Sequence, residues 1–141
     1  MNERSTETRS VINERELPYP PEKVWRALTQ PHLIEEWLMK TDFMPVEGHR
    51  FNLQRNPRPD LNILIECRVL VVEPNKTLSY TWSAFDLESV VTWTLTPTST
   101  GTHLRMEQSG FRPDQKLAYG GARGGWQEFL ENLEQVLART Q

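Results

Sequence analysis

Between residues 62 and 108, apolar and polar side chains alternate with a period of two, in segments separated by turn residues. The alternating segments are 62–72, 78–82, 91–95 and 102–108. This period predicts β-strands with one face buried and the other in water. Turn residues at Pro74-Asn75 and over Pro97–Gly101 leave short connections, which favour an antiparallel meander. One face of this sheet must therefore be covered by another element.

The element long enough to cover the sheet is an amphipathic helix that we predict over residues 113–139. Its apolar side chains recur at spacings of three and four, at Trp126, Phe129, Leu130, Leu133, Val136 and Leu137. Ahead of Trp126, the stretch Gly120–Gly125 contains four glycines, each costing a helix about 0.8–1.0 kcal/mol relative to alanine. Close backbone approach or bending, a ligand entrance and an anion-binding loop are alternative explanations. No Lys-Ser/Thr pair follows, so a Walker-type loop is not indicated.

Shorter elements precede the meander. They are a strand over residues 11–17, helices over 20–28 and 31–38, strand pieces over 43–55 and a loop over 56–60. Pro31 separates the two helices, and proline suits the first turn of the second. Gly48 predicts a turn between the strand pieces, and Pro57 with its neighbours predicts the loop.

This order of elements predicts one α+β domain, with residues 1–9 frayed and residues 10–141 folded as a single unit. A twisted sheet curves, and a straight helix cannot fill it completely. We therefore expect a gap between the concave face of the sheet and the last helix, which is a natural place for a small molecule.

The order of motifs along residues 10–139 resembles a known family. The residues that carry the resemblance are Pro21-x-x-Val24-Trp25-x-Ala27-Leu28-Thr29 with Pro31 and Trp37, Pro45-x-x-Gly48, Pro74 with Leu78 and Thr81-Trp82, Gly101-Thr102-x-Leu104, Ser109-Gly110-Phe111 and Gly125-Trp126-x-x-x-Leu130-x-x-Leu133. The chain is similar to the helix-grip proteins of the birch-pollen-allergen and START type, and within them to the family of the C-terminal domain of the activator of the heat-shock protein 90 ATPase.

The resemblance implies a helix-grip fold, in which a curved antiparallel sheet surrounds the long C-terminal helix and encloses an apolar cavity. Many members carry a Gly-Gly pair where this chain has Gly48-His49. Many also carry a histidine where this chain has Gln108. His49 and Gln108 are therefore the polar positions at which this protein is expected to differ in what it binds.

The candidate cavity residues are mostly large and apolar, and the same side chains could equally form an ordinary core. The candidates are Trp37, His49, Phe51, Cys67, Tyr80, Trp82, Trp93, Met106, Gln108, Phe111, Tyr119, Trp126, Phe129, Leu130 and Leu133. Buried indole N–H groups need partners, and Gln108 is a plausible acceptor for one of them. If there is a site, we expect it beneath the Gly120–Gly125 turn.

Composition argues against several classes of function. The net charge is −3, the pI is about 5.6 and the basic residues are scattered, so nucleic-acid binding is not expected. Cys67 is the one cysteine, which favours a buried apolar role and a reducing compartment. No segment resembles a signal peptide or a span of roughly 20 apolar residues, so a cytoplasmic location is expected. The three histidines have no metal-ligand spacing, and no metal or cofactor is expected.

Three functions remain open, and the first is favoured. The first is binding of a small, largely hydrophobic ligand in the cavity. The second, which only the resemblance implies, is a co-chaperone-like module that binds the heat-shock protein 90 chaperone. The third is a cyclase- or hydrolase-like enzyme in the same cavity, with His49 as the best candidate base. No catalytic residue is assigned, and the sequence leaves monomer and homodimer open.

Overall fold

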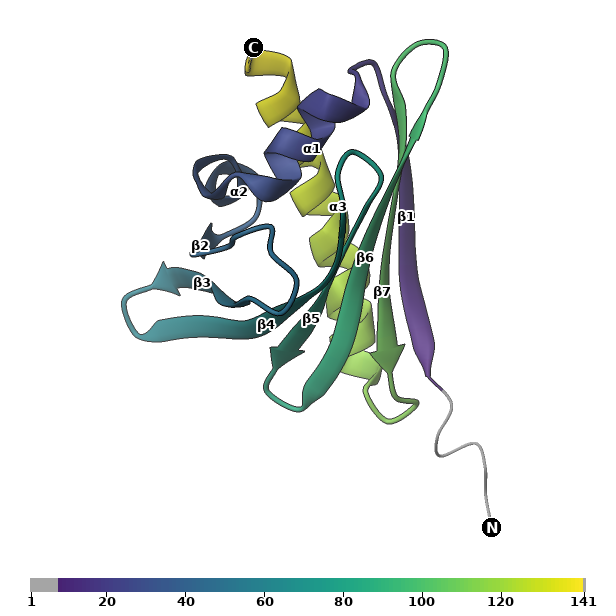
Figure 1. The fold of residues 1–141 in the computed structure, drawn as a ribbon. Coiled ribbons are helices and arrows are strands. Elements are labelled where there is room, and N and C mark those ends of the chain that lie inside the picture. The colour runs from purple at the N-terminus through teal and green to yellow at the C-terminus, as the bar shows by residue number, and fades with distance from the viewer. Residues whose placement is uncertain (1–7, 141) are drawn as a thin grey trace.

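The computed structural model describes residues 8–140, and it shows a seven-stranded antiparallel sheet curved around one long helix (Figure 1). In chain order the elements are β1 (Arg9–Leu17), α1 (Pro21–Thr29), α2 (Pro31–Trp37), β2 (Lys40–Thr41), β3 (Arg50–Arg58), β4 (Leu61–Glu73), β5 (Thr77–Ala84), β6 (Leu87–Pro97), β7 (Thr102–Phe111) and α3 (Lys116–Arg139). The strand order is β1-β7-β6-β5-β4-β3-β2. The predicted helix-grip fold is therefore confirmed.

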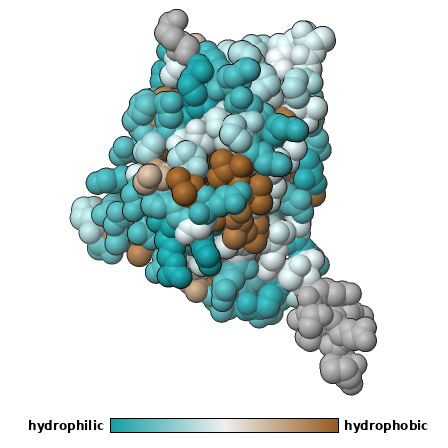
Figure 2. Space-filling view, viewed as in Figure 1, coloured by the Kyte–Doolittle hydropathy of each residue, from teal (hydrophilic) through white to brown (hydrophobic). Residues whose placement is uncertain are grey.

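The alternation in the strands places one set of side chains against α3. In β6, for example, Val91, Trp93 and Leu95 are buried, whereas the side chains between them are partly exposed. The opposite face of the sheet is mostly hydrophilic in Figure 2, apart from one hydrophobic patch near the middle of the view. The core thus lies between the concave face of the sheet and α3, as the period of two requires.

The two short helices close one end of this core. Pro21 and Pro31 occupy the first positions of α1 and α2, where a missing N–H costs no helical hydrogen bond. The Trp37 indole N–H donates to the Ala27 carbonyl oxygen at 2.8 Å and so joins α2 to α1. Both helices contact α3 near its C-terminal end (Figure 1).

The segment between α2 and β4 differs from the predicted one. The strand pieces are Lys40–Thr41 and Arg50–Arg58, with irregular chain between them in which Gly48 takes a φ of 88°. Residues 56–58, predicted as loop, continue β3. The register with β4 shifts between Arg55 and Arg58, so Pro57 falls in an irregular part of the ladder, which is where strands tolerate proline.

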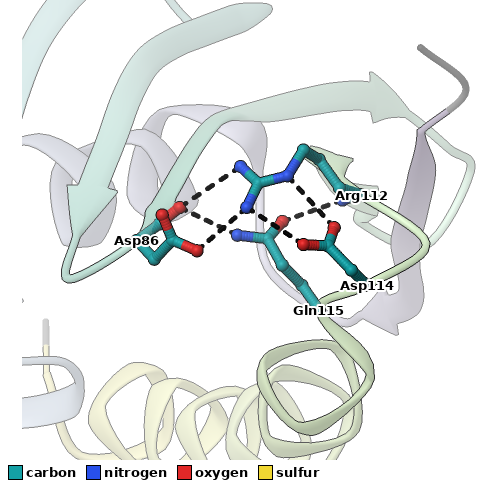
Figure 3. A network of polar contacts seen from close by, with 4 residues as sticks. All are labelled: Asp86, Arg112, Asp114 and Gln115. Atoms are coloured by element: carbon teal, nitrogen blue, oxygen red, sulfur yellow. Dashed lines mark hydrogen bonds and ion pairs between the residues drawn. The ribbon is translucent and has the colours of Figure 1, made fainter. Parts of the chain in front are cut away.

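The last helix begins at Lys116, three residues later than predicted, because the residues before it form a turn. The Arg112 backbone N–H donates to Gln115 Oε1 at 2.8 Å, and Gln115 is the N-cap residue of α3. Figure 3 shows that Arg112 and Gln115 also donate to Asp86 in the β5–β6 turn, whereas Asp114 pairs with Arg112. These contacts favour a closed turn over another turn of helix.

Two other expectations concern the ends of the chain and membranes. The expected frayed segment, residues 1–9, falls mostly on residues 1–7, which lie outside the described residues, and Arg9 already belongs to β1. Within residues 8–140 no helix is both long and apolar enough to cross a membrane.

Candidate functional site

Trp126 lies at the centre of an aromatic cluster between the sheet and α3. Its ring centroid is 5.3 Å from that of Trp82, 5.7 Å from that of Trp93 and 5.5 Å from that of Phe129. Trp82 and Trp93 come from neighbouring strands, β5 and β6, whose inward faces meet here. Tilted and edge-to-face arrangements at these separations are the favoured ones for aromatic pairs. The rings themselves therefore occupy the space between β5, β6 and α3.

A chain of buried hydrogen bonds runs through the same place. The Trp126 indole N–H donates to Gln108 Oε1 at 2.7 Å, and Gln108 Nε2–H donates to Ser89 Oγ at 2.9 Å. The Ser89 hydroxyl in turn donates to the Trp82 carbonyl oxygen at 2.9 Å. Gln108 and Ser89 are both buried. Among the described residues no buried side-chain nitrogen or oxygen lacks a partner, so the chain is fully satisfied.

A second branch of the cluster leads from Trp93 to His49. The Trp93 indole N–H donates to Tyr80 Oη at 3.0 Å, and the Tyr80 ring packs on Phe51 at 5.3 Å. His49 stacks on the outer side of Phe51, with ring centroids 6.4 Å apart. Burial raises the pKa of Tyr80, so its hydroxyl stays protonated at neutral pH. Gln108 and His49 thus lie at opposite ends of the cluster, and only Gln108 contacts Trp126.

Most other candidate residues complete the core around these rings. Trp37 packs edge-on against Trp93 at 5.6 Å, and Tyr119 packs against Phe111 at 5.5 Å. The remaining side chains, which are buried, are Cys67, Met106, Leu130 and Leu133. Burial, with smaller contributions from Asp42 and Glu66, raises the pKa of the Cys67 thiol to about 12. The thiolate is therefore scarce at neutral pH, and Cys67 is poorly suited to be a nucleophile.

The glycine turn, residues 120–125, continues α3 without a break. A Cβ added at any of its four glycines would meet no atom within 4 Å, so the close backbone approach predicted for this stretch is wrong. The buried residues of α3 begin only at Trp126 and continue through Leu130, Leu133, Val136 and Leu137. The first half of α3, residues 116–125, is therefore only lightly anchored, which the sequence signalled through its few large apolar residues.

A hollow of about 710 Å³ lies between the glycine turn and β1, and we call it the entrance hollow. It is lined by Ser10, Val11, Ile12, Asn13, Tyr119, Gly120, Arg123, Gly124 and Gln127. Two hydrogen bonds cross it, from Tyr119 Oη–H to the Ser10 carbonyl oxygen at 3.3 Å and from Gln127 Nε2–H to Asn13 Oδ1 at 2.6 Å. The sequence did not indicate the β1 residues, because only the fold brings them beside the last helix.

The entrance hollow is close to the buried polar chain. Val11 lines the hollow, and it pairs with Gln108 across the β1–β7 ladder. One strand therefore separates the hollow from the residue that accepts the Trp126 hydrogen bond. Within residues 8–140 no group of three or more His, Cys, Asp or Glu residues could hold a metal ion.

Comparison with known proteins matches this fold and these motifs to a family. The family model described as "Activator of Hsp90 ATPase homolog 1-like protein", AHSA1, matches residues 18–138. The chain belongs to the AHSA1 family. A comparison with curated proteins finds no match.

Solved structures of similar proteins agree with the AHSA1 fold. Protein MLL2253 from Mesorhizobium loti is 65% identical, with a TM-score of 0.88, over 94% of this chain and 99% of that one. CalU16 from Micromonospora echinospora is 25% identical, with a TM-score of 0.77, over 94% and 78%. DynU16, a protein of the dynemicin biosynthetic locus, is 26% identical, with a TM-score of 0.80, over 92% of this chain and 47% of that one.

Proposed function

We propose that this AHSA1-family protein binds a small, largely hydrophobic molecule between the sheet and the first half of α3, with Trp126 at the centre of the site. The observation that carries the proposal is the glycine turn. Its four glycines weaken the helix, and none of them is required by packing. They stand directly before the residue that joins the aromatic cluster to the buried polar chain.

The weakness of the first half of α3 gives the ligand a way in. Each glycine costs the helix about 0.8–1.0 kcal/mol relative to alanine, and residues 116–125 include no fully buried side chain to offset that cost. Local opening of this half requires the loss of few contacts, such as those that Tyr119 makes with Phe111 and Ser10. Segments that admit ligands are drawn from such low-stability parts of a fold.

The groups beneath this segment suit an apolar ligand with one polar group. Trp82, Trp93 and Phe129 would contact its apolar part once the Trp126 ring moves aside. Gln108 and Ser89 would then exchange hydrogen bonds with the ligand in place of the indole N–H. Indoles, an amide and a hydroxyl orient a ligand but do not transfer protons readily at neutral pH, so these groups support binding more than catalysis.

The test is a titration of intrinsic tryptophan fluorescence with fatty acids and with 1-anilinonaphthalene-8-sulfonate. We expect saturable changes in emission, and amide chemical-shift changes centred on β7 and the first half of α3. Gly121→Ala should lower the open population, and with it the association rate, about fivefold, because alanine adds about 1 kcal/mol of helix propensity. Met44→Ala, on an exposed loop residue far along the chain from α3, is the matched control.

Two results would contradict the proposal. One is a saturable ligand whose chemical-shift changes map away from β7 and α3. The other is an association rate that is the same in Gly121→Ala and in the unaltered protein, since the segment would then not limit entry.

A further inference from the structure

The entrance hollow between β1 and the first half of α3 has a positively charged wall. Arg123 lines the hollow, and no acidic residue is among those that line it. Arg9, the first residue of β1, adjoins Ser10 at the rim. Along the chain, no acidic residue occurs between Asp114 and Glu128. In a protein of net charge −3, the hollow is therefore a local positive site.

The two arginines gather around one aromatic ring. The guanidinium carbon of Arg9 lies 5.6 Å from the centre of the Tyr119 ring, and that of Arg123 lies 6.0 Å from it. At such distances an aromatic ring attracts a cation electrostatically. The ring itself is fixed, because its hydroxyl donates to the Ser10 carbonyl oxygen and its edge packs against Phe111. Tyr119 thus holds two like charges at the mouth of the hollow.

No carboxylate neutralises these two charges. In the part of the chain that the structure describes, neither Arg9 nor Arg123 forms an ion pair. Arg15, farther along β1, differs from them, because it pairs with Glu134 at 3.2 Å and donates to Gln127 Oε1 at 2.7 Å. Since like charges repel each other, an anion in the hollow would be attracted to both arginines and would reduce their repulsion.

The buried polar chain next to the hollow could not hold such an anion. Its side chains, Gln108, Ser89 and the Trp126 indole, are neutral. An ionised group buried among them would lack a counter-charge, which is costly. Val11 lines the hollow and pairs with Gln108 across the β1–β7 ladder, so the charged and the neutral polar positions are neighbours. A charged group of a ligand therefore belongs in the hollow, and a neutral one can reach Gln108.

We propose that the ligand is an amphipathic carboxylic acid, whose carboxylate binds in the entrance hollow against Arg9 and Arg123 and whose apolar chain extends toward Trp126. Arginine suits this role because its parallel N–H groups match the two oxygens of a carboxylate. The inference rests on the proposed function, since the apolar chain occupies the site proposed there. It adds the class of ligand and the two residues that select it.

The test is a fluorescence titration of the full chain with dodecanoate and with methyl dodecanoate, which has the same chain but no charge. We expect dodecanoate to bind about fivefold or more tightly than the ester, and this preference to shrink as salt rises. Replacing both arginines, Arg9→Gln with Arg123→Gln, should weaken dodecanoate binding about tenfold and leave ester binding unchanged, because each charged contact at an exposed site contributes a few-fold. Glutamine and arginine have similar helix propensities, so this variant should stay folded.

The matched control is Arg105→Gln with Arg139→Gln, which removes the same charge from β7 and from the last turn of α3, away from the hollow. It should bind both compounds like the unaltered protein. Equal affinities for dodecanoate and its ester, or a dodecanoate affinity that is unchanged without Arg9 and Arg123, would overturn this inference and leave the proposed function standing. No saturable binding of either compound would overturn the proposed function, and this inference with it.

Discussion

Gln108 occupies an inward position in β7 that an alternating strand normally gives to an apolar side chain. It is 1% exposed, and its amide accepts from Trp126 and donates to Ser89. A buried amide of this kind is tolerated only because its partners are in place. At the scale of single residues, this amide orients the Trp126 indole, and with Ser89 it supplies the polar groups of the proposed ligand site.

Gln108→Leu should lower the free energy of unfolding by about 1–3 kcal/mol, because the Trp126 indole N–H would be left buried without an acceptor. Urea denaturation measures this as a lower midpoint with an unchanged slope. Because Ser89 Oγ accepts a hydrogen bond from Gln108, a double-mutant cycle with Ser89→Ala should show coupling between the two positions. A midpoint equal to that of the unaltered protein would show that this polar chain does not stabilise the fold.

His103 behaves differently, because it lies on the outer face of the sheet between two carboxylates. One ring nitrogen contacts Glu16 and the other lies 2.6 Å from Glu14. Only the protonated ring can donate to both, so hydrogen bonds to Glu16 and then Glu14 raise the pKa of His103 above its usual 6.5.

Because the pKa of His103 is higher in the folded than in the unfolded state, its stabilising effect is complete below the unfolded value of 6.5. The effect is lost as pH rises through the raised folded value. We expect the free energy of unfolding of His103→Asn to fall less between mildly acidic and mildly alkaline pH than that of the unaltered protein. Urea midpoints at the two pH values measure this difference. If His103→Asn lost as much stability with rising pH as the unaltered protein does, groups other than His103 would be responsible for the loss.

At the scale of elements, α3 consists of two halves with different roles. From Trp126 onward it packs into the core through side chains at helical spacing, including Leu130 and Leu133. Before Trp126 it presents glycines to open space. The helix persists through residues 120–125 because neighbouring turns and the Gln115 turn hold its ends, although local propensity opposes it.

Gly121→Ala and Gly125→Ala should each raise the free energy of unfolding by up to about 1 kcal/mol, since alanine favours the helix and no atom lies within 4 Å of the new Cβ. Thermal denaturation measures the gain as a higher Tm. Gly110→Ala is the matched control, and it should lower Tm, because Gly110 has a φ of 114° and its Cβ would lie 2.8 Å from the Glu88 carbonyl oxygen. A fall in Tm for Gly121→Ala would mean that the glycine turn packs in some other way.

At the scale of the whole molecule, the curved sheet closes around α3 and buries side chains from every long strand. Cys67 reports on this closure, because it lies in β4 beneath the core and is the one cysteine of the chain. Its burial raises the pKa of the thiol to about 12, so both access and thiolate formation depend on opening of the structure.

Reaction of Cys67 with Ellman's reagent should be slow in the native protein and should rise in parallel with global unfolding in urea. Local opening of residues 116–125 should not expose β4, so ligands of the proposed site should slow labelling only as far as they stabilise the whole fold. Rapid labelling without denaturant would show that β3 and β4 open separately from the rest of the sheet.

The periods of the sequence by themselves determined the strands of the meander, the two short helices and the amphipathic second half of α3. These features follow from alternation and from 3.6-residue spacing, which are local properties. Pro57 misled the prediction, because only the pairing of β3 with β4 reveals the irregularity that accommodates it. Local turn chemistry likewise could not show that Arg112 and Gln115 bind Asp86, since that contact joins two distant turns.

Trp126 and its glycine turn were indicated by the sequence, but their surroundings were decided by tertiary structure. Alternation predicted that Gln108 faces inward, and the register of β7 with β6 put it beside Ser89. Whether the glycines pack closely or face open space depends on the distance between α3 and β1, and no local sequence pattern determines that distance. The exposure of Phe85 was equally beyond the sequence, because a hydrophobic residue in a turn is buried or exposed according to what the rest of the chain places over it.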